Sequence, residues 1–188
     1  MIKATLNDKA IIVDILTQSF EGNQSVNYII RQDKSKAKRL RQLINYSFKV
    51  CLLNGEVYLS DNKVACALCV FPEKKGNKLK KLFLDLGLIL KVTGLSKLSR
   101  AVKRETAIEK AMPHLPLYHI WYIGVNPMSQ GKGHGSKLLQ DILDRASELN
   151  RTAVLETSTE RNLPWYTKFG FKIYNQLEFD YTLYLLQH

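Results

Sequence analysis

The chain has 188 residues, of which 45% are hydrophobic and 24% charged, and its formal net charge is +11. This composition is ordinary for a soluble globular protein, and the length predicts a single domain with a sizeable core. No window is long and apolar enough for a membrane-spanning helix, and residues 1–8 lack the apolar stretch of a signal peptide. We therefore expect neither feature.

The three cysteines, Cys51, Cys66 and Cys69, are few and odd in number. This count argues against a disulfide framework and predicts a reducing, cytoplasmic location. Cys66 and Cys69 have the spacing of a metal-binding pair, but no second pair exists. Side chains three apart on a strand also point to opposite faces. We therefore expect no metal site.

The positive charge is concentrated in the middle of the chain. Residues 31–110 hold 19 Lys/Arg and 7 Asp/Glu, a net of +12, while the remaining residues hold 9 and 10, a net of −1. A solvated surface is the first interpretation, and the alternatives are an anionic substrate, an anionic membrane surface or nucleic acid. No nucleic-acid-binding motif accompanies the charge, so we expect no nucleic-acid partner.

The first part of the chain predicts two helices and three strands. Ile2–Thr5 can form a short strand, and Asp8 is a candidate N-cap for a helix over residues 11–20. A second helix starts near Asp33 or Ser35 and ends at Asn54-Gly55. Two strands follow, at 57–59 and 64–71, around a turn at 60–63.

Residues 78–112 predict a helical insertion. Apolar residues at helical spacing occupy 79–90, and a second helix covers 98–112. The apolar stripe is interpreted as packing on the protein's own core, with an interfacial membrane helix as the alternative. Because the insertion lies between two strands, it could also cover a substrate pocket as a lid.

The last part of the chain alternates strands and helices. Strands are expected at 118–125, 152–157, 171–174 and 179–186, with helices after the glycine-rich turn and over 161–169, the latter ended by Gly170. The strand–helix–strand crossover makes strands 118–125 and 152–157 parallel neighbours. The predicted fold class is therefore α/β, with a mixed sheet of about six to seven strands flanked by helices.

A glycine-rich turn, Gln130-Gly131-Lys132-Gly133-His134-Gly135-Ser136, joins a strand to an amphipathic helix. Glycines allow close approach of a ligand to the backbone, and the free N–H groups at a helix start form an anion site. The turn is no P-loop, because Lys132 is followed by Gly133, and its spacing does not fit the dinucleotide fingerprint. A phosphate cradle is the favoured interpretation, and a plain turn before a helix is the alternative.

This loop resembles the pyrophosphate loop of the GNAT acetyltransferases, whose pattern is Gln/Arg-x-x-Gly-x-Gly/Ala. A second block, Leu155-Glu156-Thr157-Ser158 through Arg161-Asn162-Leu163-Pro164-Trp165-Tyr166-Thr167-Lys168-Phe169-Gly170-Phe171, resembles the subset of that family that includes puromycin N-acetyltransferase. Residues 1–117 match only in the order of their elements. The resemblance implies the GNAT fold and transfer of an acetyl group from acetyl-CoA to a primary amine.

The same resemblance implies roles for individual residues. Tyr166 matches the family's general acid, which protonates the leaving thiolate, and Asn162 matches a position that contacts coenzyme A. The strand before the loop would pair through its backbone with the pantetheine arm, and Gly124 there would permit a bulge. The implied cofactor-binding residues are Ile123, Gly124, Val125, Gln130, Gly131, Lys132, Gly133, His134, Gly135, Ser136 and Asn162.

The residue that removes the proton from the amine is less clearly indicated. Strand 118–125 carries no acidic residue, which leaves Glu156 and His119 as candidates. Glu156 lies within an apolar strand, where burial would raise its pKa toward a useful value. Its alternative role is a structural carboxylate. His119 is the weaker candidate, because a lone histidine in a strand is usually only hydrogen-bonded.

The sequence as a whole predicts a cytoplasmic acetyl-CoA-dependent N-acetyltransferase that acts on a small-molecule amine. We expect a monomer or homodimer without membrane contact. The alternatives are a protein or peptide N-acetyltransferase and a non-catalytic CoA-binding module.

Overall fold

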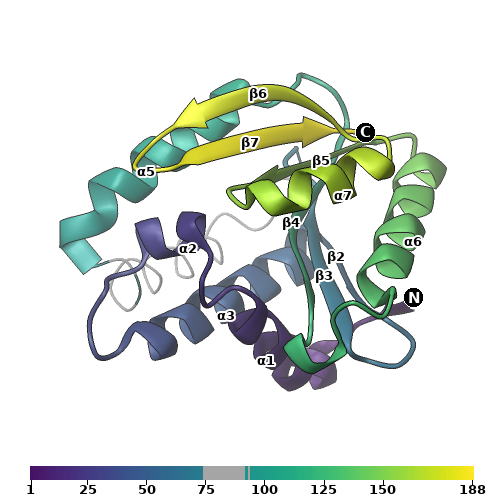
Figure 1. Ribbon diagram of the computed structural model, residues 1–188, viewed down its shortest axis with the longest axis horizontal. Helices are drawn as coiled ribbons and strands as arrows, with labels where there is room; N and C mark the ends of the chain where they lie inside the picture. Colours follow the sequence, from purple (N-terminus) through teal and green to yellow (C-terminus); the bar gives the residue numbers. More distant parts are fainter. Residues whose placement is uncertain (74–91, 93) are drawn as a thin grey trace.

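The structure, a computed structural model, describes residues 1–73, 92 and 94–188 (Figure 1). The apolar stripe predicted at 79–90 lies outside the described residues. A seven-stranded mixed sheet has the order β1-β2-β3-β4-β5-β7-β6. Its strands are β1 (Ile2–Lys3), β2 (Gly55–Leu59), β3 (Ala65–Val70), β4 (Leu117–Val125), β5 (Thr152–Thr157), β6 (Lys172–Glu178) and β7 (Thr182–Gln187). The predicted fold class is confirmed.

Helices cover both faces of the sheet. They are α1 (Lys9–Ser19), α2 (Gln24–Ile29), α3 (Lys36–Asn54), α5 (Gly94–Ala111), α6 (His134–Glu148) and α7 (Leu163–Lys168). Short 3-10 turns are η1 (Leu6–Asp8), η3 (Pro127–Ser129) and η4 (Glu160–Asn162). The predicted helix over 98–112 is therefore present as α5, and the predicted helix over 161–169 is divided between η4 and α7.

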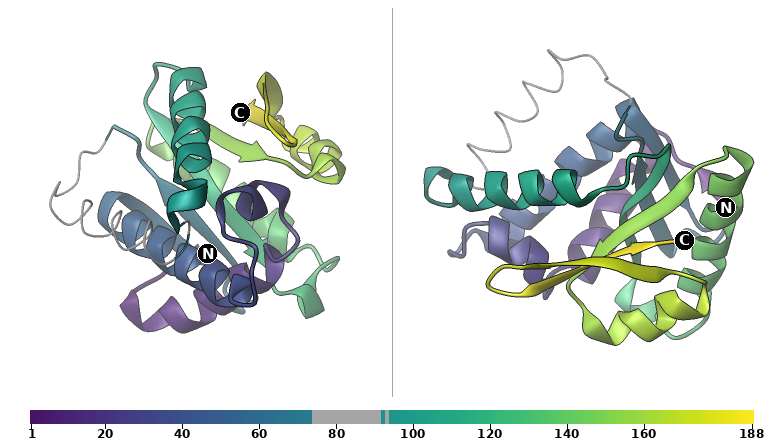
Figure 2. Two further views of the ribbon diagram at one scale, coloured as in Figure 1. Left: turned by 90° about the vertical axis from the view of Figure 1, so that its left-hand side faces the viewer. Right: turned by 90° about the horizontal axis from the view of Figure 1, so that it is seen from above.

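The core has two main parts, one on each face of the sheet. Apolar side chains of α1 and α3 pack on one face, and those of α6 and α7 pack on the other. Cys66 belongs to the first part and Cys69 to the second, as expected for strand residues three apart. A smaller cluster joins Ile108 of α5 to Leu183 and Leu185 of β7. Figure 2 shows α5 lying along this end of the sheet.

Two local features at the N-terminal end differ from the prediction. Asp8 is the N-cap residue of α1, as predicted, but its side chain makes no cap hydrogen bond to that helix; its Oδ2 instead accepts from Thr5 N at 3.0 Å and closes a capping box around η1. The short helix α2 was missed. Its N-cap is Asn23, whose side chain accepts from Val26 N at 3.0 Å. Six residues are too few for hydrophobic periodicity to reveal a helix.

Helix α6 is held on the sheet by a buried carboxylate, Glu56 of β2. Its oxygens accept hydrogen bonds from Tyr58 OH at 2.9 Å, Tyr118 OH at 3.0 Å, Arg145 Nη2 at 3.2 Å and Lys3 Nζ at 3.3 Å. Burial alone would raise the pKa of Glu56, but these donors outweigh it and lower the pKa to about 2. The carboxylate is therefore ionised and fully bonded, and it fixes the helix that follows the glycine loop.

The parallel strands β4 and β5 pair only at their beginnings, as Figure 1 shows. Leu117 lies opposite Thr152, and the last pair is His119 with Val154. Beyond that pair the strands diverge, and among the described residues none pairs with residues 120–125 of β4 on the β5 side. This divergence opens the site described below.

The bulge expected at Gly124 lies elsewhere. The β3–β4 register shifts between Leu68 and Cys69, which face Tyr122 and Ile120, so the extra residue of β4 is Trp121. Gly124 has a different reason to be glycine. A Cβ there would lie 2.8 Å from Leu16 Cδ2 and 3.0 Å from Ser19 Oγ, so a larger residue would require these side chains of α1 to shift.

Candidate functional site

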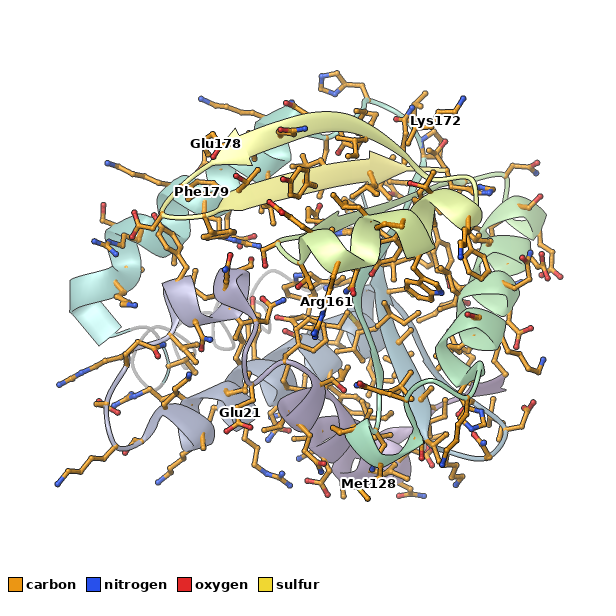
Figure 3. All side chains as sticks on the ribbon, in the orientation of Figure 1. Glu21, Met128, Arg161, Lys172, Glu178 and Phe179 are labelled. Carbon is orange, nitrogen blue, oxygen red and sulfur yellow. The ribbon has the colours of Figure 1, made fainter. Side chains whose placement is uncertain are left out.

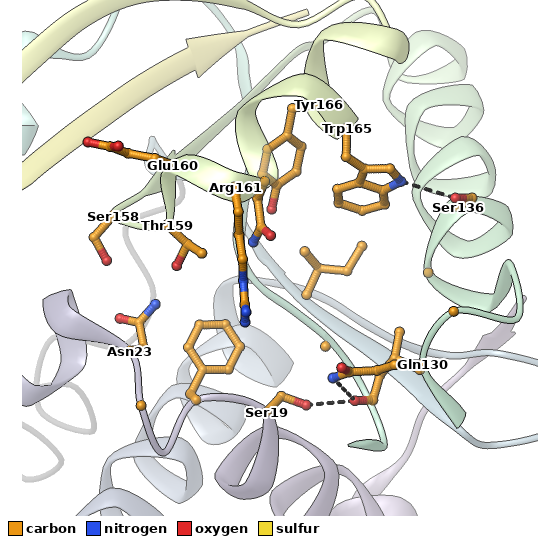
Figure 4. Close-up of a pocket in the computed structure, with 18 of the residues that line it drawn as sticks. Ser19, Asn23, Gln130, Ser136, Ser158, Thr159, Glu160, Arg161, Trp165 and Tyr166 are labelled. Carbon is orange, nitrogen blue, oxygen red and sulfur yellow. Dashed lines mark hydrogen bonds between the residues drawn. The ribbon is translucent and has the colours of Figure 1, made fainter. Parts of the chain in front are cut away.

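A cleft of about 1240 Å³ opens where β4 and β5 diverge (Figure 4). One end is formed by the glycine loop, the start of α6 and the end of β4. The other end is formed by the α1–α2 loop, the residues after β5, and η4. Tyr166 of α7 lies between the two ends. The lining includes Ser19, Phe20, Asn23, Ile123, Gly124, Val125, Gln130, Gly131, Gly133, His134, Gly135, Ser136, Ser158, Thr159, Glu160, Arg161, Asn162, Trp165, Tyr166 and Thr182.

The glycine loop has the backbone conformation that its sequence requires. Gly131 and Gly133 have φ angles of +75° and +81°, which side-chain-bearing residues adopt only at a cost. Gly133 is the N-cap of α6, and no side chain caps the helix. The first turn of α6 also contains no acidic residue. Its first N–H groups lack intrahelical partners, so this helix start suits an anion such as a pyrophosphate.

Two contacts fix the loop against its surroundings. Trp165 Nε1 donates a hydrogen bond to Ser136 Oγ at 3.0 Å and thereby ties α7 to the start of α6. A Cβ at Gly135 would lie 3.1 Å from Val125 Cγ2, so the helix start lies directly against β4. The anion site and the strand edge therefore form one continuous wall of the cleft.

The exposed edge of β4 presents only some of its backbone groups to the cleft. Asn126 N donates to Val64 O of the β3 side at 2.8 Å. Because backbone groups alternate in direction along a strand, those of Gly124 also face β3, and those of Ile123 and Val125 face the cleft. Val125 O already accepts from Gln130 Nε2 at 3.2 Å and lies 2.9 Å from Ser19 Oγ. Ile123 therefore has the backbone groups best placed to pair with an extended ligand.

Tyr166 is a buried residue whose ring is held by its neighbours and whose hydroxyl faces the cleft (Figure 4). Its ring centroid lies 4.8 Å from that of Trp165 and 5.8 Å from that of Phe171. Burial raises the pKa of Tyr166 above that of an ordinary tyrosine, so the phenol keeps its proton at neutral pH. Asn162, four residues earlier, also lines the cleft. The geometry suits a proton donor.

Glu156 and His119 form a buried pair just beyond the cleft. Their side chains are each 8% exposed, and His119 Nε2 lies 2.8 Å from Glu156 Oε2. Burial acts to raise the pKa of Glu156, but the opposing effects of His119 and Arg104 leave it lowered. The expectation of a raised pKa for Glu156 is therefore wrong. Glu156 Oε1 is buried and has no hydrogen-bond partner among the described residues.

The α1–α2 wall of the cleft is attached to α5 by buried polar contacts. Arg104 of α5 donates to Ser25 Oγ at 2.7 Å and to Tyr181 OH at 3.0 Å. Ser25 N in turn donates to Ser158 Oγ at 3.3 Å, which joins α2 to the end of β5. Lys97 of α5 donates to the carbonyls of residues 27 and 28 at 3.3 and 3.2 Å. The predicted insertion helix α5 thus supports this wall.

Most of the residues predicted for the site line the cleft. Two of them are not among its described lining residues. Glu156 is one, and its position is given above. Lys132 is the other: it lies in the glycine loop, and its Nζ donates to Met128 O at 3.3 Å. His134 lines the cleft, and its Nδ1 lies 3.3 Å from Asn62 Nδ2 of the β2–β3 turn.

Several lining residues were not predicted. Arg161 and Trp165 lie within the block that carries the family resemblance. Each is next to a predicted site residue in the sequence, Asn162 or Tyr166, and this could have indicated them as site residues. Ser158 and Thr159 directly follow a predicted strand. The residues of the α1–α2 loop gave no such signal, because only the tertiary fold brings this loop to β4.

The described residues contain no group of three His, Cys, Asp or Glu side chains placed to hold a metal ion. Across the same part of the chain, no helix has both the length and the apolar character needed to cross a membrane.

Comparison with known proteins adds a family match and a set of similar structures. Residues 97–173 match the family model of the acetyltransferase (GNAT) domain. A Corynebacterium glutamicum structure described as histone acetyltransferase HPA2 and related acetyltransferase is 18% identical, with a TM-score of 0.73 over 99% of this chain and 93% of that chain. Arylalkylamine N-acetyltransferase 2 from Aedes aegypti is 12% identical, with a TM-score of 0.68 and coverages of 100% and 96%.

A third similar structure is the polyamine N-acetyltransferase of Drosophila melanogaster, which is 13% identical, with a TM-score of 0.57 and coverages of 99% and 97%. At these identities the likeness establishes a shared fold. The matched domain contains the glycine loop and the cleft residues of η4 and α7.

Proposed function

We propose that this N-acetyltransferase, whose GNAT domain is matched at residues 97–173, takes acetyl-CoA as its donor and the primary amine of a small molecule as its acceptor. One observation carries the proposal. A single cleft joins an anion-binding helix start to a buried tyrosine hydroxyl and continues to a polar wall on the other side. The two substrates can therefore meet in one cleft.

The residues at the glycine-loop end fit coenzyme A. The N–H groups at the start of α6, together with Gly131 and Gly133, would hold the pyrophosphate, and Ile123 would pair with the pantetheine arm. Gln130, His134, Gly135, Ser136 and Asn162 line the same path. Acetyl-CoA, when bound, supplies the acetyl group as a reactive thioester. The side chain of Lys132 would contribute only charge, because it lies outside the described lining.

Tyr166 serves as the proton donor in this proposal. Its raised pKa keeps the phenol protonated until sulfur departs, and the packed ring fixes the position of the hydroxyl oxygen. Because this proton is needed only as the bond to sulfur breaks, Tyr166 contributes to turnover and little to the affinity for the cofactor.

The His119–Glu156 pair receives the proton of the amine. Glu156 stays ionised because its pKa is lowered, so it accepts a hydrogen bond from Nε2–H of His119. In that tautomer, Nδ1 is the ring nitrogen that can accept a proton. Since neither side chain is among the described lining residues of the cleft, the proton travels through intervening water. Glu156 then acts by orienting His119, and His119 is the base.

A small molecule is the favoured acceptor because the polar end of the cleft is walled by the α1–α2 loop, with α5 behind it. The arylalkylamine and polyamine enzymes named above are similar in fold along nearly the whole chain. The closer resemblance to the puromycin N-acetyltransferase subset rests on residues 155–171. Buried free thiols at Cys51, Cys66 and Cys69 are consistent with a single domain that works in a reducing, cytoplasmic compartment.

The decisive experiment measures thiol release from acetyl-CoA with a panel of small primary amines and a panel of peptides. We expect amine-dependent release from the small-molecule panel. Release with peptides alone would make the chain a peptide acetyltransferase. Absence of release with every acceptor, in a protein whose melting temperature acetyl-CoA still raises, would identify a non-catalytic CoA-binding module.

A further inference from the structure

Arg161 is a charged side chain that extends into the cleft and has no polar partner in the described part of the chain. It belongs to η4, is exposed, and lines the cleft. In the view of Figure 3 it is drawn near the centre, whereas Met128 is drawn at the lower edge. In Figure 4 its guanidinium reaches from η4 toward the side where Ser19 and Asn23 lie. Among the described residues, no hydrogen bond or ion pair engages it.

The acidic residue beside it does not neutralise this charge. Glu160 Oε1 accepts a hydrogen bond from Tyr184 OH at 2.9 Å, and in Figure 4 Glu160 points away from Arg161. The nearby lining residues Asn23, Ser158 and Thr159 are polar but uncharged. This end of the cleft therefore has a local positive charge and hydrogen-bonding groups around it.

The position of Arg161 separates it from the pyrophosphate site. Figure 4 shows Gln130 and Ser136 on one side of the cleft and Ser158, Thr159 and Asn23 on the other, with the Arg161 guanidinium between Tyr166 and the α1–α2 wall. The anion site at the start of α6 is already served by backbone N–H groups. The charge of Arg161 is therefore available to the second substrate.

We propose that Arg161 binds a carboxylate of the acceptor, so that the substrate is an amine that also carries a carboxylate. This rests on the function proposed above and narrows its substrate class. A guanidinium presents two parallel N–H donors that match a carboxylate and hold it in one orientation. The same charge repels an acceptor whose further groups are cationic, such as a polyamine. Holding the carboxylate at Arg161 orients the amine within the cleft.

The test compares acceptors in pairs that differ only in the carboxylate. Glycine, β-alanine, 4-aminobutyrate and phenylalanine are each compared with their methyl esters. We expect the best carboxylate acceptor to exceed its ester by roughly 10- to 100-fold in kcat/KM, the range for a hydrogen bond to a charged group. Arg161→Gln should remove this preference by raising the KM for the carboxylate acceptor. The KM for acetyl-CoA should stay unchanged, and Arg161→Lys should retain an intermediate preference.

Lys168→Gln is the matched control, because Lys168 is exposed on α7 and is not among the lining residues. It removes one positive charge from the same helical region, and it should leave the preference for carboxylate acceptors over their methyl esters intact. Equal kcat/KM for acids and esters would overturn the proposal while the acetyltransferase function stands. An Arg161→Gln variant that raises the KM for acetyl-CoA alone would overturn it also, because Arg161 would then serve the cofactor.

If no amine is acetylated, the proposed function fails, and binding then decides the role of Arg161. The chemical shifts of β-alanine and its methyl ester would be followed during titration with the CoA-bound protein. If Arg161→Gln weakens the binding of β-alanine at least tenfold, the result supports the carboxylate site. Equal binding of acid and ester to both proteins would overturn it.

Discussion

His119 Nε2 lies 2.8 Å from Glu156 Oε2, and the two side chains meet where β4 and β5 begin to diverge. The pair is 37 residues apart in the chain and is brought together by the parallel pairing of these strands. The described cleft lining begins further along both strands, at Ile123 of β4 and at Ser158 after β5. This placement makes it the best candidate for receiving the proton of the acceptor amine.

The first prediction concerns this pair. His119→Gln should lower kcat by roughly 10²-fold, the low end for general acid–base catalysis, with little change in the KM for acetyl-CoA. Glu156→Gln should lower kcat less, because the imidazole of His119 is retained and only its orientation is lost. This variant should also alter the pH profile of kcat. Initial rates across pH measure both. A purely structural pair would instead lower the melting temperature while the activity per folded molecule stays the same.

The second prediction concerns Tyr166. Tyr166→Phe removes one oxygen and keeps the ring contacts with Trp165 and Phe171, so folding and acetyl-CoA binding should be near normal. Turnover should fall by roughly 10²-fold, because the departing sulfur loses its proton donor. Tyr174→Phe is the control, since its hydroxyl is buried without a partner among the described residues. Turnover within about threefold of the parent in Tyr166→Phe would remove Tyr166 from the mechanism.

The third prediction concerns Gly133, whose φ angle is +81° and whose Cβ would point into open space. Gly133→Val should abolish the rise in melting temperature that acetyl-CoA causes, because a β-branched residue does not tolerate this conformation. Gly133→Asn should retain much of the rise, because asparagine adopts positive φ more readily. Thermal melts with and without acetyl-CoA compare the two. An equal rise in both variants would place the pyrophosphate elsewhere.

The fourth prediction concerns stability and pH. A drop in the pKa of Glu56 from 4.5 to about 2 corresponds to roughly 3 kcal/mol of stability at neutral pH. Because the folded-state pKa is the lower one, this contribution is complete above pH 4.5 and is lost as pH falls toward 2.

Urea denaturation of Glu56→Gln measures this contribution. The variant should be less stable than the parent at pH 7, and the difference should shrink at pH 3. The exposed Glu109→Gln is the control and should change little at either pH. If the stability difference between Glu56→Gln and the parent does not depend on pH, the lost stability comes from the packing of the side chain.

The sequence by itself determined the parts of the site that are local in the chain. The glycine loop, its flanking strand and its helix are consecutive, so the positive φ angles at Gly131 and Gly133 follow from residues close together in sequence. The spacing of Asn162 and Tyr166 likewise placed both on one wall of the cleft. The crossover rule was enough to make β4 and β5 parallel neighbours.

Only the tertiary structure decided the features that depend on distant segments. The pKa of Glu156 is lowered by His119 and Arg104, which lie on other elements, so no local sequence pattern indicates this effect. Gly124 lies where α1 packs against β4, and Arg161 faces the α1–α2 loop across the cleft. Backbone conformation is set mainly by neighbours in sequence, whereas burial, charge and cavity shape are set by neighbours in space, which only the folded chain assembles.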